Sequence, residues 1–271
     1  MLRSVRAAML GRIIAGLALL CTGAAWSQAP VEDRLAAIRA RGELRVCIWP
    51  DYLGMSWRNP RTGEVDGMDA DMARLFATRL RVRLAFVELP GPGISAPIEA
   101  GQCDVAMTGV TVTEERAARI AFTKPYLSSP LVGVANRASQ RVREWTDIDR
   151  PGVVVAVVET APAEALMRAA LRRAELAALR PPRRREAEVQ AGRADVFVTD
   201  VPYARGLAQQ QDWVRLVEPP ARFGETLMAY AVPRGDPGWL AEVNNFLAGA
   251  KADGTLARAA ERFGLQALLV Y

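Results

Sequence analysis

The sequence predicts an α/β fold, because short apolar, strand-like runs alternate with helical stretches along the chain. Runs rich in β-branched residues, such as 153–158, are typical of buried strands. Between these runs, apolar side chains recur every three or four residues, as they do over Met68–Leu80, which predicts amphipathic helices. The pattern begins again after Gly152, which indicates two α/β units.

The first unit is expected to contain short apolar strands with helices between them. Its predicted elements are a strand over 44–49, the helix over Met68–Leu80, a strand over 84–89, a short helix ending near Gly101 and a strand over 104–109. Residues 131–135 are expected to form an extended connector to the second unit.

The second unit repeats this alternation. Its predicted elements are a strand over 153–158, a helix over 164–176, a strand over 196–199 and an extended run over 227–232. Two helices follow, over 239–251 and 256–263, and Gly254 supplies the break between them.

The first residues predict export through a cleavable signal peptide. Three arginines precede an apolar run over 13–21, and a small-residue segment follows that ends at Ser27, where we expect cleavage. The apolar run is far shorter than the roughly 20 residues that span a bilayer. Cys21 leaves a lipid-modified N-terminus as the alternative, although Leu20 is bulkier than lipoprotein processing normally accepts.

Charge gives no reason to expect a nucleic-acid partner. The chain carries 35 basic and 30 acidic residues, and removing 1–27 takes away three arginines and no acids. The net charge then falls from +5 to (35 − 3) − 30 = +2 over 244 residues. The arginine-rich, proline-marked segment 180–185 is interpreted as a solvated loop rather than a nucleic-acid patch.

Residue types that the chain lacks or rarely uses narrow the chemistry further. The sequence has no histidine, which excludes imidazole bases and histidine-containing metal sites, and we expect no metal and no cofactor. After export, Cys47 and Cys103 remain. They lie at unequal depths of two predicted strands, so we expect two free, buried thiols rather than a disulfide.

Candidate binding residues gather where the predicted strands end, since ligands of open α/β sheets collect at the carboxyl ends of strands. Arg116 suits a carboxylate, because its planar guanidinium can bind both oxygens, and Asp200 suits an ammonium group. Trp49 and Tyr52 offer aromatic faces to a side chain. The full candidate set is Trp49, Tyr52, Thr108, Gly109, Val110, Thr111, Arg116, Glu159, Thr160 and Asp200.

Five segments carry a family resemblance over nearly the whole mature chain: GELRVCIWPDY (42–52), TGEVDGMDADMA (62–73), AGQCDVAMTGVTVTEERAARIAFTKPYL (100–127), AGRADVFVTD (191–200) and KADGTLARAAERFG (251–264). With these segments the chain resembles the bacterial extracellular solute-binding proteins of family 3, which are periplasmic receptors of amino-acid ABC transporters. The resemblance implies a monomeric periplasmic binding protein, not an enzyme, that delivers an amino acid or related small carboxylate to an inner-membrane permease.

The resemblance also implies the two-lobed, type II periplasmic binding protein fold. One lobe would hold residues 31–130 and 232–271, and the other would hold residues 131–231. Two extended crossovers, near 127–131 and 229–231, would act as a hinge that closes the lobes around the ligand.

By the same resemblance, Arg116 grips the ligand carboxylate with help from Thr111, and Thr108 and Gly109 line the floor of the cleft. Asp200 takes the ammonium group, and Tyr52 covers the ligand side chain.

Two departures from the family pattern concern the ligand. Pro162 stands where many members have a threonine that supports the carboxylate, and Thr160 is a candidate cap for the helix that follows. Trp49 stands where receptors for basic amino acids have an aspartate, which favours an apolar or aromatic ligand over a basic one. Glu159 leaves some preference for a cation open.

Two other functions fit the same resemblance. Dehydratases resembling cyclohexadienyl dehydratase, which act on prephenate or arogenate, share this fold and need a positioned acid, for which Glu159 and Asp200 are candidates. The short Asp200 side chain favours binding alone. Periplasmic sensor domains share the fold too, but these are usually fused to a transmembrane helix and a kinase.

Overall fold

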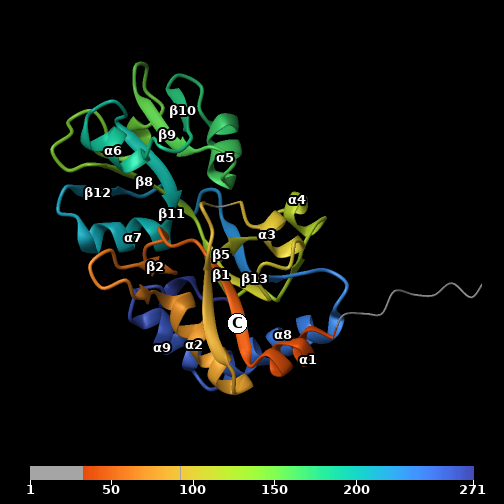
Figure 1. Ribbon diagram of the computed structural model, residues 1–271. Coiled ribbons are helices and arrows are strands. Elements are labelled where there is room, and N and C mark those ends of the chain that lie inside the picture. The colour runs from red at the N-terminus through yellow and green to blue at the C-terminus, as the bar shows by residue number, and fades with distance from the viewer. Residues whose placement is uncertain (1–32, 92) are drawn as a thin grey trace, which may run out of the picture. The chain divides into compact units, whose positions relative to one another are not determined.

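Two mixed β-sheets organise the chain in the computed structural model, which describes residues 33–91 and 93–271 (Figure 1). The signal-peptide prediction for residues 1–27 lies outside the described residues. Within the described residues, no helix has the length and apolar character needed to cross a membrane.

The first sheet has the strand order β4-β1-β5-β13-β6 in the described chain, and β7 pairs with the first half of β13. β1 is parallel to β4 and β5, and β13 is antiparallel to β5, so the carboxyl ends of β1 and β5 meet at one edge. The strands are β1 (Glu43–Ile48), β4 (Arg83–Glu88), β5 (Val105–Thr111), β6 (Ala121–Phe122), β7 (Leu127–Ser129) and β13 (Thr226–Val232), with a separate ribbon of β2 (Trp57–Arg58) and β3 (Val65–Asp66).

Helices cover both faces of this sheet. On one face, Phe76 of α2 packs against Trp239 and Phe246 of α8, with ring centroids 5.6 and 4.5 Å apart. On the other face, Ile98 of α3 packs in a cluster with Ala106 of β5. Each large side chain buried this way contributes about 1.5–3 kcal/mol. The helices are α1 (Arg34–Arg41), α2 (Met68–Leu80), α3 (Ser95–Glu99), α4 (Glu114–Ala117), α8 (Pro237–Ala252), α9 (Thr255–Glu261) and the short 3₁₀ turn η2 (Gln266–Leu268).

The second sheet has the strand order β10-β9-β11-β8-β12 in the described chain. β9 is parallel to β10 and β11, and β8 is antiparallel to β11 and β12. α5 packs on one face, and α6 and α7 pack on the other (Figure 1). The elements are β8 (Leu131–Asn136), η1 (Trp145–Asp147), β9 (Val154–Val158), α5 (Pro162–Ala170), β10 (Glu175–Leu179), α6 (Arg185–Gln190), β11 (Val196–Asp200), α7 (Val201–Gln210) and β12 (Val214–Val217).

Two predictions about the second unit are wrong. Residues 131–135 are not a connector but most of β8, an inner strand that is buried between β11 and β12. The predicted helix over 164–176 ends at Ala170, because the next turn is held by Asp149 instead of by helical hydrogen bonds. Its Oδ1 accepts the backbone N–H groups of Arg172, Arg173 and Ala174 at 2.7–3.0 Å, after which the chain enters β10.

Two neighbouring strands carry the chain from one sheet to the other. β7 leads directly into β8, and β13 returns the chain to the first sheet. The two pair antiparallel, with Thr226 opposite Ser129 and Met228 opposite Leu127. The boundaries of the lobes at residues 130, 131, 231 and 232 stay a prediction.

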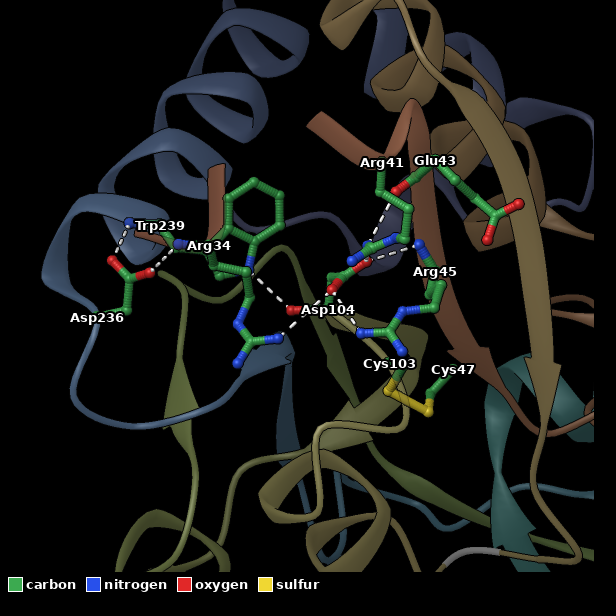
Figure 2. Close-up of polar contacts among 9 residues, drawn as sticks. All are labelled: Arg34, Arg41, Glu43, Arg45, Cys47, Cys103, Asp104, Asp236 and Trp239. Atoms are coloured by element: carbon green, nitrogen blue, oxygen red, sulfur yellow. Dashed lines mark hydrogen bonds and ion pairs between the residues drawn. A yellow bond between two sulfur atoms is a disulfide. The ribbon is translucent and has the colours of Figure 1, made fainter. Parts of the chain in front are cut away.

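Cys47 and Cys103 form a disulfide, so the prediction of two free thiols is wrong (Figure 2). The strand register pairs Cys47 with Ala106, and the two cysteines do differ in depth. Cys103, however, precedes β5, and its backbone is not held in that register. The two Cα atoms are 5.5 Å apart, within the usual range for a disulfide.

Beside the disulfide, the fully buried carboxylate of Asp104 joins α1 to the amino-terminal ends of β1 and β5 (Figure 2). Its oxygens lie 2.6–3.4 Å from the guanidinium groups of Arg34, Arg41 and Arg45, so the buried negative charge has three positive partners. The backbone carbonyl of Asp104 accepts a hydrogen bond of 2.8 Å from Trp239 Nε1 of α8. This cluster anchors the sheet at the edge opposite the carboxyl ends of the strands.

Replacing both cysteines by alanine (C47A with C103A) is expected to lower the free energy of unfolding by about 2–4 kcal/mol, because a disulfide restricts the unfolded chain. Urea unfolding measures this change. A reductant should lower the urea midpoint of the wild type and leave that of the double variant unchanged. Two alkylated cysteines in the exported, unreduced protein, seen by mass spectrometry, would contradict the bond.

Candidate functional site

A pocket of about 90 Å³ lies where the carboxyl ends of strands from both sheets meet. Eight of the ten predicted site residues line it: Trp49, Tyr52, Thr108, Gly109, Val110, Thr111, Arg116 and Asp200. Further lining residues are Gly91, Ile94, Leu131, Val158, Ala161, Pro162, Ala163, Arg185, Thr199 and Thr226.

The floor of the pocket is the backbone at Gly109, which has a φ of +57°. A Cβ at this position would lie 2.9 Å from the ring of Tyr52, so only glycine fits under the ring. The N–H of Gly109 donates to Oδ2 of the buried Asp69 at 2.6 Å, and Tyr126 Oη donates to the same oxygen at 2.6 Å. Burial raises the pKa of Asp69 to about 7, although both hydrogen bonds favour its charged form.

Thr108 joins the ends of the two central strands. Its Oγ1 accepts the backbone N–H of Trp49 at 3.1 Å and shares a hydrogen bond of 2.7 Å with the hydroxyl of Ser56. The side chain is buried, so the hydroxyl fixes the position of Trp49 as well as lining the pocket.

Arg116 is positioned by the turn that follows β5. The hydroxyl of Thr113 caps α4 by accepting the backbone N–H of Arg116 at 3.2 Å. Arg116 Nη1 donates to the backbone carbonyl of Thr111 at 3.0 Å, which holds the guanidinium at the end of the strand. Burial lowers the pKa of Arg116, so an anion in the pocket would offset a desolvation cost that the guanidinium already carries.

Trp49 and Tyr52 offer two aromatic rings to the pocket, and Tyr203 packs against both rings from outside the lining. Trp49 lies 5.4 Å from Tyr52 and is stacked at 6.4 Å on Tyr203, between ring centroids. Tyr203 comes from α7, which packs on the second sheet, whereas Trp49 and Tyr52 follow β1 of the first sheet. The sequence prediction missed Tyr203. Its signal was the Asp200-Val-Pro start of a helix, which places Tyr203 in the first turn beside Asp200.

Asp200 ends β11 and caps α7. Its Oδ1 accepts the backbone N–H of Tyr203 at 2.9 Å, and its Oδ2 accepts from the hydroxyl of Thr199 at 3.4 Å. Burial and then the negative charge of Asp200 raise the pKa of Tyr52 well above its ordinary value, which keeps that phenol protonated. Asp200 is the only carboxylate that lines this pocket in the described chain.

Arg185 is a second guanidinium in the pocket, and the prediction of a solvated loop over 180–185 is wrong for it. The Arg185 residue is 7% exposed, whereas the side chains of Arg180, Arg183 and Arg184 are more than half exposed. No local signal separated these arginines, because all four lie in one charged, proline-marked segment.

Glu159 and Thr160, which the sequence predicts as ligand-binding residues, are not among the lining residues of this pocket. They line a neighbouring hollow of about 750 Å³ that shares Trp49 and Arg185 with the pocket. Glu159 forms an ion pair with Arg180, which turns it away. Thr160 has a φ of +63° and does not cap α5; its N–H donates to Glu164 Oε2 at 2.8 Å, and Ala161 is the N-cap residue.

The described residues contain no group of three or more acidic or thiol side chains placed to hold a metal ion. The lining of the pocket offers charge, hydrogen bonding and aromatic contact, with a guanidinium on the first sheet's side, and a carboxylate and a second guanidinium on the other.

Comparisons with known proteins identify the family and the fold. The model of the bacterial extracellular solute-binding proteins, family 3, matches residues 44–266. The cyclohexadienyl dehydratase of Pseudomonas aeruginosa is 30% identical to this chain over 226 residues, and the alignment covers 82% of each chain. The glutamine-binding protein of a Bacillus subtilis ABC transporter is 23% identical over 228 residues, and the alignment covers 82% of this chain and 81% of the relative. The crystal structure of an ancestral amino-acid-binding protein, described as a precursor of cyclohexadienyl dehydratase, is 31% identical with a TM-score of 0.76, over 85% of this chain and 99% of its own. The predicted two-lobed, type II periplasmic binding fold is confirmed.

Close packing beside the site predicts a sensitive position on α7. A Cβ added at Gly206 would lie 2.8 Å from the Cβ of Leu53, which belongs to the segment after β1, about 1 Å closer than carbon atoms pack. Gly206→Ala is therefore expected to push the Trp49–Tyr52 wall away from Asp200. The overpacking should cost about 1–3 kcal/mol of folding free energy, and the displaced wall should lower the affinity for the ligand.

Calorimetry with the best ligand from a thermal-shift screen measures this loss. Gly249→Ala in α8 is the matched control, because its Cβ would meet only the side-chain end of Arg79 at 3.4 Å. Unchanged affinity in a folded Gly206→Ala variant would show that this contact does not set the geometry of the pocket.

Proposed function

Because the chain belongs to the bacterial extracellular solute-binding proteins of family 3, we propose that it captures an amino acid or related small carboxylate between its lobes and delivers it to an inner-membrane ABC permease. The observation that carries the proposal is the placement of Arg116 and Asp200 around one pocket, from opposite sheets. Neither sheet alone presents both charges, so the ligand makes its full set of contacts only when the lobes are together.

In this proposal the ligand lies with its carboxylate at Arg116 and Thr111. Its ammonium group faces Asp200, and its body lies against the rings of Trp49 and Tyr52. A basic side chain is disfavoured, because Arg185 adds a second positive charge to the lining. The protein acts as a monomer in the periplasm.

Arg116→Ala is expected to weaken binding by about 2–5 kcal/mol, because a desolvated ligand carboxylate would lose its charged partner. Arg116→Lys should recover only part of this loss, since an ammonium cannot supply two parallel hydrogen bonds. The unliganded variants should melt like the wild type, because α4 is short and its cap uses the backbone of residue 116. Calorimetry with a ligand found by thermal-shift screening, with melts of each unliganded protein, measures both effects.

Normal binding by Arg116→Ala would mean that the ligand carboxylate is held elsewhere. Unfolding of the unliganded variant would instead make Arg116 a residue of the fold.

A second candidate function is dehydration of a cyclohexadienyl substrate, and it is favoured by the likeness to the Pseudomonas aeruginosa dehydratase. Prephenate would lose water and carbon dioxide to give phenylpyruvate, with an acid protonating the departing hydroxyl group. Asp200 lines the pocket and is the candidate for that acid. Its Oδ1 is already used in capping α7, and Glu159 is paired with Arg180 outside the pocket, so we favour binding without turnover.

Incubation with prephenate and with arogenate distinguishes the two functions. The proposed receptor should form phenylpyruvate or phenylalanine no faster than a buffer control. Product formation that exceeds this control, and that Asp200→Asn abolishes while Glu159→Gln does not, would make the protein a dehydratase with Asp200 as its acid.

A further inference from the structure

The pocket contains one more positive charge than capture of a simple amino acid requires. Arg116 alone suffices for one carboxylate, yet Arg185 lines the same pocket from the start of α6. Arg185 is buried although it is a charged side chain, which is rare unless a partner repays the lost hydration.

The surroundings of Arg185 hold it in one orientation. Its guanidinium carbon lies 4.1 Å from the ring centroid of Tyr203 and 5.0 Å from that of Phe197. Its Nε donates to Glu186 Oε1 at 3.0 Å, and the hydroxyl of Tyr203 donates to the same carboxylate oxygen at 2.6 Å. A guanidinium has five N–H donors, and this ion pair uses the one on Nε.

The charges that face the pocket do not balance. Glu186 pairs with Arg185 but lines the neighbouring hollows, not the pocket. The lining therefore holds two guanidinium groups and one carboxylate, that of Asp200, which is partly engaged by the backbone of α7. Because Glu186 already offsets the charge of Arg185, what Arg185 offers a second acid group is its N–H donors other than the one on Nε.

Building on the proposed function, we propose that Arg185 binds a second acid group of the ligand, so that the ligand class is a small dicarboxylate with an apolar or aromatic body. One carboxylate lies at Arg116 and the other at Arg185, and the body lies against the rings of Trp49 and Tyr52. Asp200 remains placed for an amino group where the dicarboxylate carries one.

Matched ligand pairs test this assignment by calorimetry on the mature protein. Glutamate is compared with glutamine, and phenylsuccinate with phenylpropanoate, since each pair differs in one carboxylate. In the wild type the diacid of at least one pair should bind about 30-fold more tightly or better. Arg185→Gln and Arg185→Met should bring that ratio close to one while the monoacid still binds, because the methionine keeps the packing on the rings without the charge.

Arg183→Gln is the control, because Arg183 lies in the same segment but is exposed and lies outside the pocket. It should leave the ratio unchanged. A ratio that stays at the wild-type value in a folded Arg185 variant would overturn the assignment. If neither Arg185 variant folds, the test rests on the wild type alone. A preference for the diacid below about threefold in both ligand pairs then overturns the dicarboxylate assignment.

The failure of this assignment is distinct from the failure of the proposed function. If Arg116→Ala abolishes the binding of mono- and diacids that the wild type binds equally well, the receptor proposal stands and the dicarboxylate assignment falls. If no carboxylate binds to the wild type, both fall.

Discussion

The buried carboxylate of Asp69 joins three parts of the chain that must stay together for the pocket to exist. It belongs to the first turn of α2, and its Oδ2 accepts hydrogen bonds from Gly109 on β5 and from Tyr126 just before β7. Gly109 can then lie flat beneath Tyr52, and Tyr126 fixes the approach to the crossover strand. A buried acid is costly to charge, and its raised pKa reflects that cost. This cost of burying Asp69 is tolerated because its Oδ2 atom positions both Gly109, at the floor of the pocket, and Tyr126, just before the crossover strand β7.

The amino-terminal and carboxyl-terminal ends of β1 and β5 have different roles. At their amino ends, the Asp104 cluster and the Cys47–Cys103 disulfide join α1, β1 and the start of β5. At their carboxyl ends, Thr108 and Thr111 use hydroxyl and carbonyl groups to hold Trp49 and Arg116 in place. A rigid base and short hydrogen-bonded turns let the binding groups be pre-organised, which lowers the ordering cost of binding.

The acidic groups in and beside the pocket already have partners within the protein. Its one carboxylate in the described chain is short and already caps a helix, and the nearby Glu159 is neutralised by Arg180. Of the two guanidinium groups, Arg185 is buried and fixed by stacking, and Arg116 is partly buried and fixed by a backbone contact. Such a site is arranged to stabilise negative charge on a bound molecule.

The sequence by itself determined those features that one segment encodes. Helical periodicity placed α2 over Met68–Leu80 without error, and apolar runs located β1, β5, β9 and β11 to within two residues. The order of strands and polar residues along the chain predicted that Thr111 and Asp200 end strands and that Arg116 follows one, but their meeting at one pocket depends on how the two sheets pack. Tertiary structure alone decided the disulfide, the inner position of β8, the end of α5 at Ala170, and the burial of Arg185 beside its exposed neighbours. Each of these depends on contacts between residues far apart in the chain, and neither periodicity nor composition within a segment reports which distant surface that segment will meet.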